Sequence, residues 1–238
     1  MKKRLDVLLV ERGLAESRAQ AQALVLAGRV PGYTKAGDQV AEDAPLELAE
    51  GRRFVSRGGE KLVHALDVFG IDVTGEDCLD VGASTGGFTD CLLQRGAARV
   101  CALDVGYGQL HPKLRADSRV TVLERRNVRY LACAELPFSP TFVTCDVSFI
   151  GLAKALPPAL ACAAPGWRAL VLVKPQFEAG PADVGKGGVV RDPDVRRRVV
   201  DAVAAQVPSW GGRVVGEAES GLPGPKGNRE LFLALAAA

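Results

Sequence analysis

The sequence lacks several features that would by themselves define a class of protein. No apolar run approaches the roughly 18–20 residues needed to cross a bilayer, because Pro157 and Pro158 interrupt the segment 155–164. We therefore expect no membrane partner, and because no secretory signal is evident we expect a cytoplasmic protein. Aromatic residues make up only 5% of the chain, so its core must consist mainly of Val, Leu, Ala and Ile.

Patterns typical of metal sites are also missing. The two histidines, His64 and His111, are isolated, and the six cysteines include no C-x-x-C pair. We therefore expect no metal site. The cysteines are far apart in a chain of 238 residues, which is too long to need disulfides for stability. We interpret all six as reduced thiols in the core.

The charges are nearly balanced, with 30 basic and 28 acidic residues and a net charge of +2. This balance excludes a protein that is basic over its whole surface, so a nucleic-acid partner would need a local basic patch. The length is sufficient for one large domain, or for one medium domain with a small companion.

The first 50 residues have the pattern of a small α+β module. Leucines at helical spacing from Leu5 predict a helix that ends near Gly13. An S-x-x-Q capping box at Ser17 predicts a second helix that ends near Gly28. Short extended segments follow from Val30 onward, with alternating leucines at positions 46 and 48, and these predict a few short strands.

The chain beyond residue 60 has the rhythm of an α/β domain. Segments of helix length separate five apolar runs, at residues 78–81, 100–103, 120–123, 142–145 and 169–173. This alternation predicts a parallel, Rossmann-like sheet covered by helices on both faces. Apolar residues on either side of a glycine- and proline-rich loop at 221–228 predict a C-terminal antiparallel hairpin. We therefore divide the chain into a module at 1–50, a basic linker at 51–59 and a large domain at 60–238.

A glycine-rich loop, D-V-G-A-S-T-G-G-F at residues 80–88, joins the first run to a helix. Glycines let a ligand approach the backbone, and the helix N-terminus offers free N–H groups. The loop also matches a G-x-S-x-G nucleophile elbow, but a serine hydrolase with this motif needs a histidine later in the chain than His111, so this alternative is disfavoured. A phosphate-binding P-loop is disfavoured because it needs a lysine where this chain has Phe88. The dinucleotide-binding motif is disfavoured because its glycine spacing, G-x-G-x-x-G, differs from the G-x-x-x-G-G found here. A tight turn without a ligand is the remaining alternative.

A nucleoside cofactor without phosphate groups suits this loop best. Asp104 ends the second apolar run, where an acidic side chain can accept hydrogen bonds from ribose hydroxyls. S-adenosylmethionine carries a ribose, an adenine and a sulfonium but no phosphate. Glycines with acidic neighbours therefore favour this cofactor.

Four motifs in sequence order resemble those of the TlyA-type proteins: D-V-G-A-S-T-G-G-F-T-D, A-L-D-V-G-Y-G-Q-L, C-D-V-S-F-I and V-K-P-Q-F-E. The resemblance implies an S4 RNA-binding module followed by an FtsJ/RrmJ-like methyltransferase domain. It also implies 2′-O-methylation of ribosomal RNA, of cytidine in 16S or 23S rRNA, with ribosomal RNA or ribosomal subunits as partners. Two alternatives stay open: an RNA-binding ribosome-assembly factor with little catalysis, and a membrane-lytic protein, as the name hemolysin of some members implies.

FtsJ-like enzymes use a Lys-Asp-Lys-Glu tetrad, and the resemblance implies that its members here are Lys61, Asp146, Lys174 and Glu230. A ribose hydroxyl is a poor nucleophile, so it has to be aligned and deprotonated. We predict that Lys174 is the base, oriented by Asp146, and that Lys61 and Glu230 hold the hydroxyl or its phosphate. A purely structural network of ion pairs is the alternative.

The predicted cofactor contacts lie in the loop and after the next two strands. They are Asp80, Gly82, Ser84, Gly86, Phe88, Asp104 and Asn127. Asn127, which the resemblance places near the adenine, could equally be a simple turn residue.

The predicted RNA contacts in the small module are Arg18, Arg4 and Lys35. The module is not basic overall, so these cations must share one face if they are to bind phosphates. The segment 30–33 departs from the V-x-V-N-G that is common in S4 modules. Three arginines at 196–198 either extend the RNA-binding surface or form a solvated helix face. The loop at 186–192 is expected near the substrate, without an assigned chemistry.

Overall fold

A computed structural model describes residues 1–26, 28–49, 51 and 53–238. The chain forms two compact units, residues 1–52 and 53–238. Residue 50, where the predicted module ends, and Arg52 of the predicted linker lie outside the described residues. Phe54 is buried in the core of the larger unit, and helix α3 (Arg57–Phe69) begins soon after it. Residues 53–59 of the predicted linker are therefore part of the larger unit.

The small unit packs two helices against a short antiparallel pair of strands. Helix α1 (Leu5–Glu11) and helix α2 (Arg18–Leu26) lie where the apolar spacing predicts them. Their buried side chains, with those of the following loops, form one core: Leu5, Leu8, Leu9, Ala15, Ala21, Val25, Val30, Val40 and Leu46. The prediction of short strands after Val30 is right for β2 (Gln39–Ala41) and wrong for residues 46 and 48. β1 (Lys2–Arg4) precedes α1 and pairs with β2 (Gln39–Ala41), whereas the alternating leucines at 46 and 48 are in no strand.

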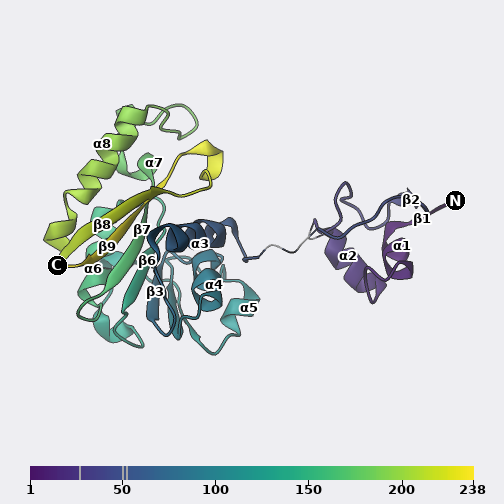
Figure 1. Cartoon of the computed structure of the whole chain (residues 1–238), viewed down its shortest axis with the longest axis horizontal. Helices are drawn as coiled ribbons and strands as arrows, with labels where there is room; N and C mark the ends of the chain where they lie inside the picture. The colour runs from purple at the N-terminus through teal and green to yellow at the C-terminus, as the bar shows by residue number, and fades with distance from the viewer. Residues whose placement is uncertain (27, 50, 52) are drawn as a thin grey trace. The chain divides into compact units, whose positions relative to one another are not determined.

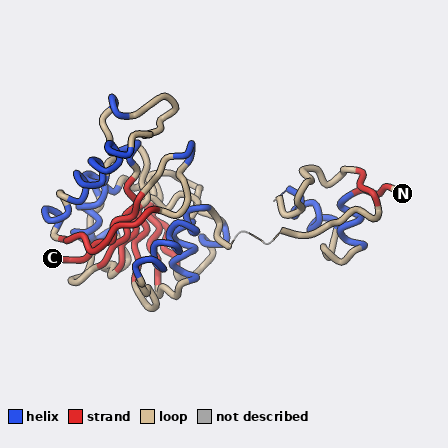
Figure 2. The backbone as a smooth tube through the Cα atoms, turned by 45° about the horizontal axis from the view of Figure 1, so that its top comes forward, coloured by secondary structure: helices blue, strands red, loops and turns tan. Residues whose placement is uncertain are grey.

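The larger unit is built on a seven-stranded sheet with the order β5-β4-β3-β6-β7-β9-β8 (Figures 1 and 2). Five strands are parallel: β3 (Asp77–Val81), β4 (Arg99–Leu103), β5 (Val120–Leu123), β6 (Phe142–Cys145) and β7 (Arg168–Val173). The last two, β8 (Gly212–Glu219) and β9 (Leu231–Ala237), run antiparallel to their neighbours. The α/β class, the Rossmann-like sheet and the C-terminal hairpin are therefore confirmed.

Helices cover both faces of this sheet (Figure 1). On one face, α3, α4 (Gly87–Gln94) and α5 (Pro112–Arg115) share a core that contains Leu62, Leu92 and Leu114. On the other, α6 (Leu152–Ala161) and α8 (Pro193–Ala204) share a core that contains Leu156 and Val199. Alternate residues of each strand point to opposite faces, which accounts for the continuous apolar runs. A short helix α7 (Pro175–Glu178) follows β7, and single turns of 3-10 helix occupy 128–130, 133–135, 181–183, 207–210 and 225–227.

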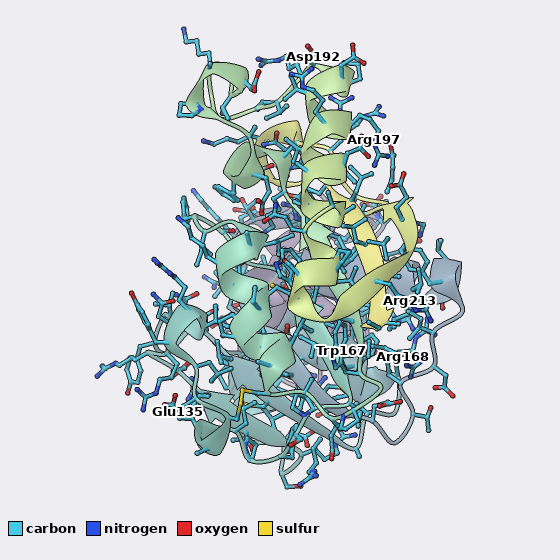
Figure 3. All side chains as sticks on the ribbon, turned by 90° about the vertical axis from the view of Figure 1, so that its left-hand side faces the viewer. Glu135, Trp167, Arg168, Asp192, Arg197 and Arg213 are labelled. Atoms are coloured by element: carbon cyan, nitrogen blue, oxygen red, sulfur yellow. A yellow bond between two sulfur atoms is a disulfide. The ribbon has the colours of Figure 1, made fainter. Side chains whose placement is uncertain are left out.

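The interpretation of all six cysteines as reduced thiols was wrong for two of them. Cys133 and Cys162 form a disulfide that ties the segment after β5 to the end of α6 (Figure 3). Cys78, Cys91, Cys101 and Cys145 are free and buried. Sequence spacing could not reveal the pair, because its members are 29 residues apart and meet only when the chain folds.

Candidate active site and RNA-binding residues

The ends of five strands meet at one edge of the sheet. The chain leaves β3 at Gly82, β4 at Asp104, β6 at Asp146 and β7 at Lys174. β9 runs in the opposite direction, with Leu231 paired to Val173, so Glu230 enters the sheet at this same edge. Open α/β sheets bind their ligands at the carboxyl ends of their strands. The predicted catalytic and cofactor residues therefore come together here from distant parts of the sequence.

The four tetrad side chains form two ion pairs. Lys61, on α3, donates to Glu230 in a pair that is almost fully buried, with 6% and 1% of these residues exposed. The Lys174 Nζ atom lies 2.5 Å from Asp146 Oδ1 and donates to Ser148 Oγ at 3.0 Å. All four line one cavity of about 270 Å³, together with Ser56 and residues of the glycine loop.

A larger cavity of about 500 Å³ lies on the other side of Asp146. Four of the seven predicted cofactor residues line it: Gly82, Ser84, Asp104 and Asn127. Asp146 and Ser148 line both cavities, so the two share a wall. Two ligands bound in these cavities would meet at Asp146, next to Lys174.

The larger cavity fits S-adenosylmethionine. Its volume lies in the range of small-molecule sites, about 300–1,000 Å³. Gly82 has φ 85°, and a Cβ there would lie 2.6 Å from the Asp146 carbonyl oxygen, so only glycine keeps this wall open. The Asp104 carboxylate is held by the N–H groups of Ser84 and Gly106, both at 2.7 Å. Asp104 and Asp146 present negative charge to a cationic ligand, and the cation in the lining, Arg126, is paired with Glu135 at 2.9 Å.

The other three predicted cofactor residues do not line the larger cavity. Asp80 is fully buried and accepts hydrogen bonds from Thr89 at 2.7 Å and Thr144 at 3.0 Å. Burial raises the pKa of Asp80 to about 6, although the two hydroxyls oppose the shift. Gly86 has φ 97° and packs against leucine side chains of the α5 region. Phe88 is buried, lines the tetrad cavity and stacks on Phe232 with ring centroids 6.0 Å apart.

Asn127 forms a turn and lines the larger cavity, and its contact with an adenine stays a prediction. Its side chain accepts a hydrogen bond from the Arg129 N–H at 3.1 Å and so caps a turn. It also lines the larger cavity.

Several further residues belong to the site and were not predicted from the sequence. Ser148 accepts from Lys174, and Gln176 donates to Glu230 Oε1 at 3.3 Å. Phe149 is 92% exposed, has φ 66° and contacts Phe177 with ring centroids 5.1 Å apart. All of them lie in the motifs C-D-V-S-F-I and V-K-P-Q-F-E. Their place in these two motifs was the feature of the sequence that could have predicted them.

In the small unit, the two predicted arginines share one buried carboxylate. Arg4 donates two hydrogen bonds of 3.0 Å to Asp6, and Arg18 donates one of 2.9 Å. Gln22 donates a further one of 3.0 Å. Asp6 is fully buried, whereas the arginine side chains are 46% and 56% exposed. These hydrogen bonds, that from Arg4 above all, hold the pKa of Asp6 well below its usual range against the effect of burial.

Lys35 is exposed in a turn that lies beside this cluster, because the Asp6 N–H donates to the Ala36 carbonyl at 3.0 Å. The structure thus brings the three predicted RNA contacts to one region of the small unit. The arginines at 196–198 are different. Arg196 donates to the carbonyl of Arg191 at 2.7 Å, and Arg197 pairs with Asp201 and Glu217, both at 2.6 Å. These internal bonds favour a solvated helix face.

Comparison with known proteins agrees with this geometry. The family model of FtsJ-like methyltransferases matches residues 54–237, and the S4 domain model matches residues 3–30. A relative from Mycobacterium tuberculosis (strain ATCC 25618 / H37Rv), 16S/23S rRNA (cytidine-2′-O)-methyltransferase TlyA, is 50% identical over 97% of this chain and 88% of its own length. The chain belongs to the TlyA family of FtsJ-like methyltransferases. Its predicted membership is confirmed.

Two further relatives show the range of names in this family. Hemolysin A from Brachyspira hyodysenteriae is 39% identical over 96% of this chain and 98% of its own. A solved structure of a candidate hemolysin from Streptococcus thermophilus is 42% identical, with a TM-score of 0.78 over 100% of this chain and 89% of that chain. The fold alone is shared with magnesium protoporphyrin IX methyltransferase from Synechocystis PCC 6803, solved with bound SAM (13% identity, TM-score 0.51, 76% of this chain and 79% of that chain).

Neither a membrane-spanning helix nor a metal-binding group of side chains is found among the described residues. None of the helices in residues 1–26, 28–49 and 53–238 has the length and apolar character of a membrane span. Across the same residues, no group of three or more His, Cys, Asp or Glu side chains is arranged to hold a metal ion.

Proposed function

We propose that this protein is an S-adenosylmethionine-dependent methyltransferase that acts on a ribose 2′-hydroxyl of ribosomal RNA. One observation carries the proposal: the four tetrad side chains line one cavity, and that cavity shares the Asp146 wall with a larger one bounded by Asp104. The activity for which the Mycobacterium tuberculosis relative is named supports ribosomal RNA as the substrate and cytidine as the nucleotide.

In this proposal, the larger cavity holds the cofactor. Asp104 accepts hydrogen bonds from the ribose hydroxyls of S-adenosylmethionine, Gly82 and Ser84 lie along it, and Asn127 lies at its adenine end. When bound, S-adenosylmethionine supplies an activated methyl group on a sulfonium. The carboxylate of Asp146, at the shared wall, faces the positive charge of that sulfonium.

The tetrad cavity holds the target ribose. Lys174 is the general base: its neutral amine would accept the proton of the 2′-hydroxyl while that oxygen attacks the methyl group that the cofactor would supply. The ammonium that forms is stabilised by Asp146 at 2.5 Å and Ser148 at 3.0 Å. The Lys61–Glu230 pair, rigid because it is buried, positions the ribose or its phosphate.

The RNA is bound in part by the small unit. Arg4 and Arg18 each bond to Asp6 and still expose about half of their side chains. Their guanidinium groups are therefore oriented in advance, and they retain free N–H groups for phosphate oxygens. Lys35 adds a third cation close by. Such contacts hold the RNA and carry little sequence information.

The test is methyl transfer from labelled S-adenosylmethionine to unmodified ribosomal subunits, followed by nuclease digestion. We expect the label on a ribose 2′-oxygen. K174M should lower the single-turnover rate by about 10²–10⁴-fold, because a positioned base contributes that much. K154M is the matched control, since Lys154 is an exposed lysine of α6 and should leave the rate unchanged. Label on a base, full activity of K174M, or no transfer to either subunit despite cofactor binding would contradict the proposal.

A further inference from the structure

Two loop segments beside the tetrad carry cations and no acidic residue of their own, although Asp183, Asp192, Glu219 and Glu230 flank them. Residues 185–191, before α8, contain Lys186 and Arg191, and residues 221–229, between β8 and β9, contain Lys226 and Arg229. All four side chains are exposed. We call them the cationic rim. Within the part of the chain that the structure describes, the rim has a single ion pair, between Arg229 and Glu219 at 3.6 Å, and both partners are exposed.

One buried side chain joins the two loops. Asn228 is 2% exposed, its Oδ1 accepts from the Val190 N–H at 3.0 Å, and its Nδ2 donates to the Gly188 carbonyl at 2.8 Å. Its own carbonyl accepts from the Gly224 N–H at 2.8 Å. Figure 1 accordingly shows the loop before α8 and the loop between β8 and β9 at the same end of the sheet. The rim is therefore one surface.

One residue of the rim, Lys226, has a backbone conformation that a residue other than glycine does not favour. Lys226 has φ 67°, in the left-handed region where a residue other than glycine is strained. Gly187 and Gly188 adopt φ 87° and 77° without strain. A strained residue persists where its surroundings fix it, and such residues concentrate at binding sites. Position 226 therefore carries a lysine although glycine would adopt this left-handed conformation without strain.

The loop that carries Lys226 and Arg229 is in contact with Glu230 of the tetrad. The backbone at Gly224 lies so close to the Glu230 carboxylate that a Cβ there would collide with it. Arg229 and Glu230 also line a third cavity of about 280 Å³ on the same side as the loop. If an RNA strand whose ribose lies in the tetrad cavity continued on this side of Glu230, its next phosphates would meet exposed cations, beside Glu219, which also lines the third cavity.

We propose that Lys186, Arg191, Lys226 and Arg229, held in place by Asn228, bind the phosphates of the RNA strand next to the target nucleotide. This inference rests on the proposed function and extends it with a second phosphate-binding surface, outside the small unit. Contacts of this kind fix the register of the strand. The rim should therefore affect RNA affinity and its salt dependence, and leave the chemical step and cofactor binding unchanged.

The first test measures RNA affinity of the full chain against salt for K186A, K226A and the double variant. Each lost phosphate contact should lower the slope of log affinity against log salt by roughly 0.7–0.9. R213A is the matched control, because Arg213 is an exposed cation of β8 that Figure 3 shows well away from Asp192, which follows the rim directly in sequence. The methyl-transfer rate at saturating subunit should be unchanged in all of them. A double variant with the wild-type slope, or an equal loss in R213A, would overturn the inference.

The second test separates binding from folding at position 226. K226G removes the charge and relieves the left-handed strain, so it should melt at a higher temperature and bind RNA more weakly. K226R keeps the charge and should bind as the wild type does. A purely structural role predicts unchanged RNA affinity in K226G, and that result would refute the inference. If the wild-type protein transfers no methyl group to any ribosomal subunit, the proposed function fails; if it does and the rim variants bind normally, only the inference fails.

Discussion

Asp6 of the small unit and Asp80 of the larger unit are both completely buried, and the two carboxylates have opposite surroundings. Asp6 of the small unit is bound by two guanidinium groups and an amide, whereas Asp80 of the larger unit is bound by two threonine hydroxyls. The pKa of Asp6 lies well below its usual range because of these cationic donors. Burial instead raises the pKa of Asp80 to about 6.

The difference reflects what each unit does with its charges. In the small unit a buried anion orients cations whose outer N–H groups are free for a polyanion. In the larger unit Asp80 does not line the larger cavity, and the charges of the active site are paired at the strand ends. The two buried carboxylates therefore differ in their partners: cationic and amide donors surround Asp6, whereas hydroxyls surround Asp80.

The largest effect on stability is expected at the buried pair of the larger unit. K61M leaves the Glu230 charge buried without its partner, which should lower the free energy of unfolding by about 3–5 kcal/mol. Urea unfolding followed by tryptophan fluorescence reports on this unit alone, because both tryptophans, Trp167 and Trp210, lie in it.

Two comparisons control that measurement. K61M/E230Q removes the unpaired charge and should recover much of the loss. R197A breaks an exposed pair, whose partners Arg197 and Glu217 are 45% and 46% exposed, and should cost at most about 1 kcal/mol. Equal losses in K61M and R197A would mean that the Lys61–Glu230 pair is not buried as the structure has it.

Asp80 should make the larger unit less stable as the pH rises. Its folded pKa of about 6 is above the unfolded value of about 3.9, so the neutral form stabilises the folded state below pH 4, and this stabilisation is lost as the pH rises through 6. D80N cannot ionise. Its stability relative to the wild type should therefore increase between about pH 4 and 6, by on the order of 3 kcal/mol. The measurement is urea unfolding at a series of pH values, and a constant difference would disprove the raised pKa.

The contribution of Asp6 to stability should change with pH in the opposite direction and by a smaller amount. Arg4 and Arg18 are about half exposed, so water can replace part of the hydrogen bonding that they lose with the Asp6 carboxylate. Its folded pKa is lowered, so its contribution is present above the unfolded value of about 3.9 and is lost as the pH falls below it. D6N should thus speed amide hydrogen exchange in α1 and α2 at neutral pH, and the difference from the wild type should shrink in acid. A difference that grows in acid would be incompatible with the contacts of Asp6.

The sequence was sufficient to predict the sheet, since buried parallel strands read as apolar runs: all five predicted runs lie within strands. Motif positions at strand ends also predicted that Asp146, Lys174 and Glu230 would meet, because parallel strands end at a common edge. The small unit was harder. β1 has three residues, of sequence K-K-R, with no apolar alternation to reveal it.

Side-chain partners could not be read from the sequence. Asp80 follows the pattern of a cofactor residue, and its burial against Thr89 and Thr144 depends on how β3, α4 and β6 pack. The Cys133–Cys162 disulfide and the link from Asn228 to residues 188–190 likewise join segments far apart in the chain. These contacts arise from tertiary packing, which leaves no local periodicity.

The central claim is that the small unit binds RNA and that Lys174 carries out the chemistry, and one titration tests both. The single-turnover rate of methyl transfer is measured against ribosomal-subunit concentration for the wild type, R4A/R18A and K174M. R4A/R18A should need more subunit to reach half of its maximum and then attain the wild-type maximum. K174M should keep the wild-type half-saturation and lose about 10²–10⁴-fold in maximum rate. A lowered maximum in R4A/R18A at unchanged half-saturation, or a wild-type maximum in K174M, would contradict this division of roles.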